Sequence, residues 1–217
     1  MTAAGRIDGG PRRADAGDGP LGVLARIRRP RPTAAPVSRC DLCAADVPDD
    51  HPHVVDLDDR SLRCACRACA LLFTSTGAAA GRFRTVPTRY ARLGGPVLGP
   101  GQWDELQVPV SVAFFFRNSR RGEVDAFYPG PAGATESLLP LDAWAGIEAG
   151  NPALATLEPD VEALLVRAPD EGYIVPIDAC YELVGRLRRT WKGFDGGADA
   201  RAELDGFFAG VRERARG

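Results

Sequence analysis

Apolar and polar residues alternate in short segments of the first half of the chain. Residues 53–58, HVVDLD, alternate as a strand does, and the polar run at 58–60 predicts a turn. Residues 61–65 then predict the returning strand of a hairpin. Beyond them, 67–75 predict a short helix or strand, and 83–93 an extended segment that would complete a small sheet.

The second half of the chain has stronger apolar segments. Residues 108–118, VPVSVAFFFRN, predict a strand that pairs with 123–129 across a tight turn. Residues 180–191 carry the apolar stripe of an amphipathic helix, and Asp178 is placed to cap it. The other predicted elements are strands over 162–168 and 172–177, helices over 143–150 and 200–216, a helical turn at 103–106 and a tight connection over 130–137.

Composition divides the chain into three parts. Residues 1–36 are rich in Gly, Pro, Ala and Arg and predict a disordered tail. A Gly/Pro-rich stretch at 94–101 predicts the boundary between a cysteine-rich metal-binding module at 37–95 and a domain at 102–217. We expect an α+β protein, in which a zinc-ribbon-like or treble-clef-like module precedes an α+β domain with a mainly antiparallel sheet.

The cysteine-rich module contains the densest chemistry in the sequence. Five of the six cysteines and both histidines lie between positions 40 and 69. Two C-x2-C pairs separated by roughly twenty residues are typical of zinc sites, because each tight turn aims two sulfurs at one ion. The simplest ligand set is therefore Cys40, Cys43, Cys66 and Cys69.

Three further side chains compete for the same ion. Cys64 lies two residues before Cys66, and His51 and His53 stand between the two cysteine pairs, separated by Pro52. Each would either replace one of the four ligands or hold a ligand in place without contacting the ion. An iron–sulfur cluster is the alternative to zinc, since cysteine thiolates bind both metals. Thiols packed as small apolar residues, or a disulfide framework, do not account for the repeated C-x2-C spacing.

Charge and composition narrow the classes of function. The net charge of −2 does not favour nucleic acid as a partner of the whole chain. Lys192 is the single lysine, which leaves little scope for Schiff-base chemistry. The apolar runs are shorter than a membrane span, and the first residues do not resemble a secretory signal. We therefore expect a cytoplasmic protein without a membrane span, whose thiols stay reduced.

Catalytic residues are hard to identify outside the cysteine cluster. Cys180 lies near a predicted helix start, but both histidines belong to the metal module, so no Cys–His pair can be drawn. We expect Cys180 to be a buried helix residue. The acidic cluster of Glu158, Asp160 and Glu162 predicts a solvated loop rather than a cation site.

The order of C-x2-C, H-x-H and C-x-C-x2-C is also similar to that of the HNH nucleases, in which a histidine pair lies between two zinc knuckles. The resemblance implies a metal-dependent nuclease. Two departures weaken it: the interval from His53 to Cys64 is short, and Ala70 stands where those enzymes often place a histidine.

Longer strings carry a second resemblance. CDLC, LRCACRACALLF, VAFFFRNS, AFYPGPAGATESLLPL, NPALATLEPDVEALLV and VPIDACYELVGRLRRTW together resemble an uncharacterised bacterial family, frequent in actinobacteria, that is encoded beside high-affinity uptake NiFe-hydrogenases. The resemblance covers about residues 38–210 and implies a hydrogenase-linked accessory role.

We therefore expect a zinc-stabilised accessory or adaptor protein that binds a hydrogenase subunit or assembly factor and catalyses nothing by itself. The first alternative is a small iron–sulfur redox protein that delivers or accepts electrons. The second alternative is the HNH-like nuclease. No catalytic residue is predicted for the favoured function, because four thiolates would close the coordination shell of the ion.

Overall fold

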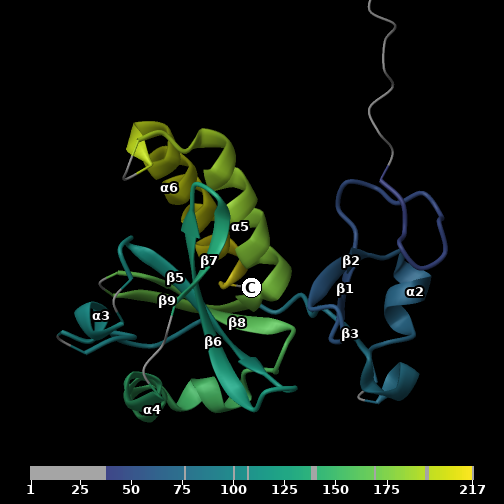
Figure 1. The fold of residues 1–217 in the computed structure, drawn as a ribbon, viewed down its shortest axis with the longest axis horizontal. Coiled ribbons are helices and arrows are strands. Elements are labelled where there is room, and N and C mark those ends of the chain that lie inside the picture. The colour runs from purple at the N-terminus through teal and green to yellow at the C-terminus, as the bar shows by residue number, and fades with distance from the viewer. Residues whose placement is uncertain are drawn as a thin grey trace, which may run out of the picture. The chain divides into compact units, whose positions relative to one another are not determined.

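The computed structural model of the chain describes residues 38–75, 77–99, 101–106, 108–137, 141–168, 170–193 and 196–216. The predicted disordered tail at 1–36 lies outside these residues. Ser38–Gly217 form one compact unit of helices and antiparallel sheets, so the mixed α and β content expected from the sequence is confirmed (Figure 1). No helix in the described ranges is both long and apolar enough to cross a membrane.

A six-stranded antiparallel sheet forms the larger part of this unit. The predicted hairpin of 108–118 with 123–129 is confirmed, as is the pairing of the two strands expected over 162–168 and 172–177. The strand order is β4-β9-β8-β5-β6-β7. The strands are β4 (Ala91–Arg92), β5 (Val112–Asn118), β6 (Glu123–Gly130), β7 (Gly133–Ser137), β8 (Glu162–Arg167) and β9 (Glu171–Pro176).

Helices cover both faces of this sheet, which explains why β5 is apolar from Val112 to Phe116. Phe114 and Phe116 face the layer formed by α5 (Ile177–Thr190) and α6 (Gly197–Arg214), whereas Phe115 faces α4 (Leu141–Gly150). Figure 1 shows α5 and α6 on one side of the sheet and α4 on the other. A strand buried on both faces reads as a continuous apolar run. The segments α3 (Gln102–Glu105) and η2 (Pro152–Thr156) flank the α4 layer.

The structure differs from the sequence-based expectation over 130–137. These residues were expected to form a tight connection, but they form a turn followed by the edge strand β7. Strand β7 pairs with β6, and the paired residues run from Ala126 with Ser137 to Gly130 with Gly133. Gly133 has φ of +127°, a conformation that glycine adopts without steric cost. Because this edge strand is only partly buried, its sequence lacks the apolar alternation that would have predicted it.

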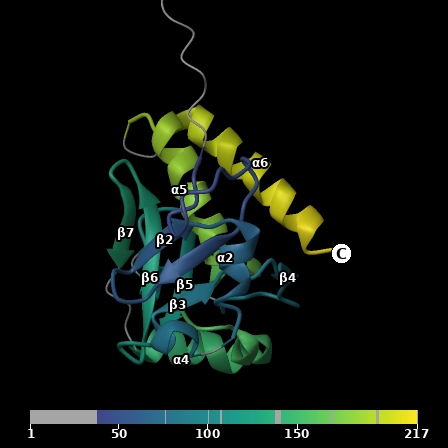
Figure 2. The same cartoon turned by 90° about the vertical axis from the view of Figure 1, so that its right-hand side faces the viewer.

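The cysteine-rich segment forms a second, three-stranded sheet in the order β2-β1-β3. The predicted hairpin is confirmed as β1 (His53–Asp56) and β2 (Ser61–Cys64), and β3 (Phe83–Thr85) joins the free side of β1. The short helix α2 (Arg67–Leu71) and the 3-10 segment η1 (Ala78–Gly81) follow β2 (Figure 2).

Strand β1 takes part in two hydrophobic cores. Val54 is fully buried and packs with Ala65 and Ala70 in a small cluster beneath α2. Val55 points to the opposite face, as alternate residues of a strand do, and joins the main core that contains Phe116. The cysteine-rich segment is therefore packed directly against the larger sheet.

The sequence predicted a boundary between two modules at 94–101, but a strand that precedes this boundary belongs to the larger sheet. Ala91 and Arg92 of β4 pair with Ile174 and Tyr173 of β9, so the end of the predicted metal module contributes to the larger sheet. Independent folding of 102–217 stays a prediction.

A fragment of residues 102–217 tests that division. If these residues form a domain, the fragment should unfold cooperatively without metal and keep its far-ultraviolet circular dichroism strand signal. Loss of that signal would mean that β4 and the apolar residues of β1 are needed to complete the fold.

Asp56, at the end of β1, organises the hairpin turn. Its side chain is 1% exposed, and its carboxylate accepts hydrogen bonds from Arg82 Nε (3.0 Å) and Nη2 (2.8 Å). The same carboxylate accepts the backbone N–H groups of Asp58 and Asp59. The hydrogen bonds from Arg82 hold the pKa of Asp56 well below its usual range, against the opposing effect of burial. One carboxylate thus joins the hairpin turn to the segment before β3.

We expect Asp56→Asn to lower the free energy of unfolding by about 1–3 kcal/mol at neutral pH, because it removes charge-assisted hydrogen bonds. The folded-state pKa is lowered, so this stabilisation is complete above the unfolded-state pKa of about 3.9 and is lost as pH falls through the folded value. Chemical denaturation from pH 7 to pH 3 should show the difference between variant and wild type shrinking below about pH 4.

The exposed Asp49→Asn serves as the control and should change stability by less than about 0.5 kcal/mol. A difference for Asp56→Asn that grows on acidification would contradict the role assigned to this carboxylate.

Candidate metal centre

The first cysteine pair lies in a tight turn that closes before β1. Cys40 N–H donates to Ala45 O and Ala44 N–H donates to Cys40 O, each at 2.8 Å. Ala44 has φ of +61°, an unfavourable conformation for a residue with a side chain. This turn places Cys43 near the second cysteine pair.

The second cysteine pair lies at the start of α2. Cys66 is the N-cap residue, and its Sγ accepts a hydrogen bond from Cys69 N–H at 3.5 Å. A C-x2-C pair at a helix start places both sulfurs on one side of the first turn. Strand β2 leads directly into this turn, so the hairpin fixes where the second pair lies.

The four sulfur atoms converge as the sequence predicted. One ligand atom each from Cys40, Cys43, Cys66 and Cys69 lie within 4.8 Å of one another. Cys43 Sγ and Cys66 Sγ are 3.7 Å apart. A tetrahedral ion with metal–sulfur bonds of about 2.3 Å requires sulfurs about 3.8 Å apart, whereas a disulfide requires about 2.05 Å. The spacing therefore fits one tetrahedral metal ion.

Hydrogen bonding makes the four thiols unequal before any metal binds. Burial acts to raise the pKa of Cys40, but backbone N–H groups led by that of Cys66 lower it to about 6. Hydrogen bonds that the Cys69 thiol donates to Cys43 and then to Cys66 raise the pKa of Cys69 to about 12. A metal ion must displace the protons that remain, so its affinity should fall as pH falls.

The other three candidate ligands form a separate group. His51, His53 and Cys64 also offer ligand atoms within 4.8 Å of one another, but they do not belong to the four-sulfur cluster. His53 Nδ1 lies 2.9 Å from Asp178 Oδ2. Asp178 therefore contacts His53 rather than capping its helix as expected, and α5 begins without a side-chain cap.

Two expectations about the larger domain have different outcomes. Cys180 is fully buried in α5, and burial raises its pKa well above the ordinary value, so the prediction of a buried helix residue is confirmed. The solvated loop expected for the acidic cluster holds only for Glu158, which is exposed, whereas Asp160 and Glu162 are 7% and 1% exposed. Arg89 donates two hydrogen bonds to Glu162, at 2.8 and 2.6 Å, because a buried carboxylate requires a partner.

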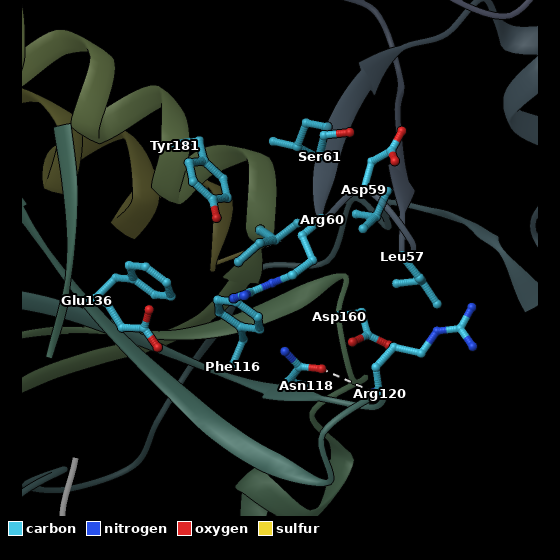
Figure 3. A pocket seen from close by; sticks show the side chains of 14 residues that line it. Leu57, Asp59, Arg60, Ser61, Phe116, Asn118, Arg120, Glu136, Asp160 and Tyr181 are labelled. Atoms are coloured by element: carbon cyan, nitrogen blue, oxygen red, sulfur yellow. Dashed lines mark hydrogen bonds between the residues drawn. The ribbon is translucent and has the colours of Figure 1, made fainter. Parts of the chain in front are cut away.

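A cavity of about 770 Å³ lies between the β1–β2 hairpin and the larger sheet. The hairpin contributes Leu57, Arg60 and Leu62, and the opposite wall includes Phe116 and Tyr181 (Figure 3). No motif marks this cavity in the sequence. The local sequence gives one hint. Leu57 continues the apolar face that Val55 begins, and both residues belong to the main core rather than to the small cluster.

Two arginines lie at this cavity with about half of each side chain exposed. Arg60 extends from the hairpin turn into the cavity, and its Nη2 donates to the buried Asp125 at 3.3 Å (Figure 3). Arg120 Nη2 donates to Asp58 at 2.7 Å, and its backbone N–H donates to Asn118. A guanidinium has five N–H donors, so each arginine can donate further hydrogen bonds to an additional carboxylate.

The chain was compared with known proteins. Residues 39–215 match the model of a family of unknown function, DUF5947. No curated protein and no solved structure matches the chain.

Removal of one clustered cysteine tests the metal centre. We expect Cys43→Ser to release the ion of the four-cysteine centre and to unfold the cysteine-rich segment, because in such small modules metal-binding energy is folding energy. Cys180→Ala, which changes a buried cysteine outside the cluster, should retain the ion. Elemental analysis and circular dichroism measure both effects, and full metal retention by Cys43→Ser would contradict the assignment.

Proposed function

The chain belongs to the family of unknown function DUF5947, and we propose that it is a zinc-stabilised accessory protein that binds a protein partner at the cavity beside its metal centre. One observation carries this proposal. The β1–β2 hairpin ends in Cys64, two residues before the cysteine pair of α2, and its turn residues line the cavity. An ion bound by the four cysteines would thus hold one wall of the binding surface in place.

The metal has a structural role in this proposal. A cysteine turn, a hairpin and a helix that starts at the second cysteine pair follow one another, which is the order of a treble-clef-like module. Zinc suits four thiolates in tetrahedral arrangement, and such a closed shell leaves no position for substrate. Iron bound by the same thiolates would instead give the redox alternative, and visible absorption of the purified protein distinguishes the two.

The cavity supports a partner of defined chemistry. Leu62, Phe116 and Tyr181 provide apolar walls, and Tyr181 is unusually exposed for an aromatic residue at 38%. Arg60 and Arg120 add two guanidinium groups to a lining that also contains the carboxylates of Asp59, Glu136 and Asp160. We propose that the partner inserts an apolar side chain and presents a neighbouring carboxylate to these arginines.

The identity of the partner rests on the family resemblance. That resemblance supports a cytoplasmic actinobacterial protein and, as its partner, a subunit or assembly factor of an uptake NiFe-hydrogenase. We propose no catalytic step for the chain itself. The burial of Cys180 supports this view, since a buried thiol of raised pKa is a poor nucleophile. Cleavage of DNA by the metal-loaded protein would instead favour the nuclease alternative.

Substitutions at the cavity test the binding surface. Tyr181→Ala and Arg120→Ala should each weaken binding to purified hydrogenase subunits or assembly factors by about tenfold, which corresponds to about 1.4 kcal/mol. Arg120 pairs with an exposed aspartate, so its removal should hardly affect folding. Affinity is measured by calorimetry, and hydrogen uptake by a deletion strain complemented with each variant.

Leu72→Ala and Arg189→Ala are matched controls, because both residues are exposed and neither lines the cavity. They should leave binding and hydrogen uptake unchanged. Normal hydrogen uptake in the deletion strain would contradict the hydrogenase link, and equal losses in cavity and control variants would contradict the proposed surface.

A further inference from the structure

The second group of ligand-type side chains is brought together by the hairpin. His53, the first residue of β1, is the register partner of Cys64, the last residue of β2. Directly opposed residues of an antiparallel pair have Cβ atoms about 5 Å apart. His51 joins them across Pro52, and the two imidazole centroids are 4.9 Å apart. One ligand atom from each of the three side chains lies within 4.8 Å of the others.

Hydrogen bonds fix the orientation of both imidazoles. His51 Nδ1 lies 2.7 Å from the carbonyl oxygen of Pro48, and His53 Nδ1 lies 2.9 Å from a carboxylate oxygen of Asp178. Both oxygens can only accept, so a neutral imidazole carries its proton on Nδ1 and leaves the Nε2 lone pair free. This is the usual arrangement of metal-binding histidines, whose second nitrogen donates to a carbonyl or a carboxylate.

The free nitrogen of His51 is the least explained polar atom of this group. His51 Nε2 is buried and has no hydrogen-bond partner within the described part of the chain. A buried acceptor normally has a partner, and an Nε2 lone pair beside a second imidazole and a thiol is suited to a metal ion. Cys180 offers no comparable metal site, because it is buried among apolar residues.

We infer that His51, His53 and Cys64 form a second metal site, separate from the four-cysteine centre, that binds a borderline divalent ion such as zinc. Bonds of about 2.0 Å to nitrogen and 2.3 Å to sulfur place neighbouring ligand atoms about 3.3–3.6 Å apart. The three ligand atoms already lie within 4.8 Å of one another, so side-chain movements alone can close the group around an ion. Three protein ligands leave a fourth position for water or a ligand atom of another molecule.

The backbone around this site is well held. Asp41 accepts the N–H of Cys64 through its carboxylate at 2.6 Å and donates its own N–H to the Cys64 carbonyl at 2.8 Å. All three proposed ligands are partly exposed, so an ion can reach them. Because His53 contacts Asp178 in the first turn of α5, an ion at this site would also strengthen the contact between the hairpin and that helix.

Metal titration of the full chain tests this inference, which does not rest on the proposed function. Protein freed of metal under reducing conditions is titrated with zinc alone and, separately, with cobalt(II) alone. We expect two ions per chain. The cobalt spectrum should show intense sulfur-to-metal absorption from the four-thiolate site and a weaker contribution from a second ion with one thiolate ligand.

Variants separate the two sites. His51→Ala, His53→Ala and Cys64→Ser should each bind one ion and retain the four-thiolate spectrum, whereas Cys180→Ala should bind two. Asp178 is a positioning residue in this scheme. Asp178→Asn should weaken the second ion by about 10-fold or more and leave the four-thiolate ion unaffected.

Three outcomes would overturn the inference. Wild-type protein could bind a single ion. Cys64→Ser could abolish the four-thiolate spectrum, which would place Cys64 in the first centre. Two ions could bind with no loss in either histidine variant, which would place the second ion elsewhere. The histidine variants keep the test decisive even where Cys64→Ser fails to fold.

Discussion

The opposite faces of β1 pack into different cores, and the cysteine-rich segment depends on this arrangement. On one face Val54 packs with Ala65 and Ala70 in a small cluster, and the partly buried Leu42, Phe73 and Phe83 pack against it. A cluster of this size buries little apolar surface, so a metal ion bound by the four cysteines would add stability to the segment. On the other face Val55 belongs to the main core. The hairpin is thus held by hydrophobic burial on one side, and an ion bound by the four cysteines would hold it on the other.

Arginine–carboxylate pairs secure the segments that have little regular structure. Asp56 and Glu162 are both almost fully buried, and each accepts two hydrogen bonds from one arginine. The arginines, Arg82 and Arg89, come from the region between η1 and β4. Breaking such a pair leaves a buried charge uncompensated, so these contacts specify where the connecting segments lie.

The metal centre and the cavity are therefore parts of one structural unit. An ion bound by the four cysteines would fix the end of β2, and the turn of the same hairpin carries Leu57 and Arg60 to the cavity. Loss of the ion would alter the cavity wall, although the ion itself would make no contact with the partner. The proposed metal-dependent binding surface would account for four converging cysteines in a chain whose chemistry is otherwise sparse.

The sequence by itself determined the elements whose signals are local. Apolar alternation predicted the first hairpin, and a continuous apolar run predicted the first strand of the second. The C-x2-C spacing predicted which four sulfurs converge, because two cysteines in one tight turn point toward the same place. Tertiary structure alone decided the rest. In the folded protein Asp178 contacts His53, which is 125 residues away in the sequence. Glu158 and Glu162 accept hydrogen bonds from Arg84 and Arg89, which belong to another segment. A side chain's distant partner depends on how whole elements pack, and periodicity along the chain carries no record of that packing.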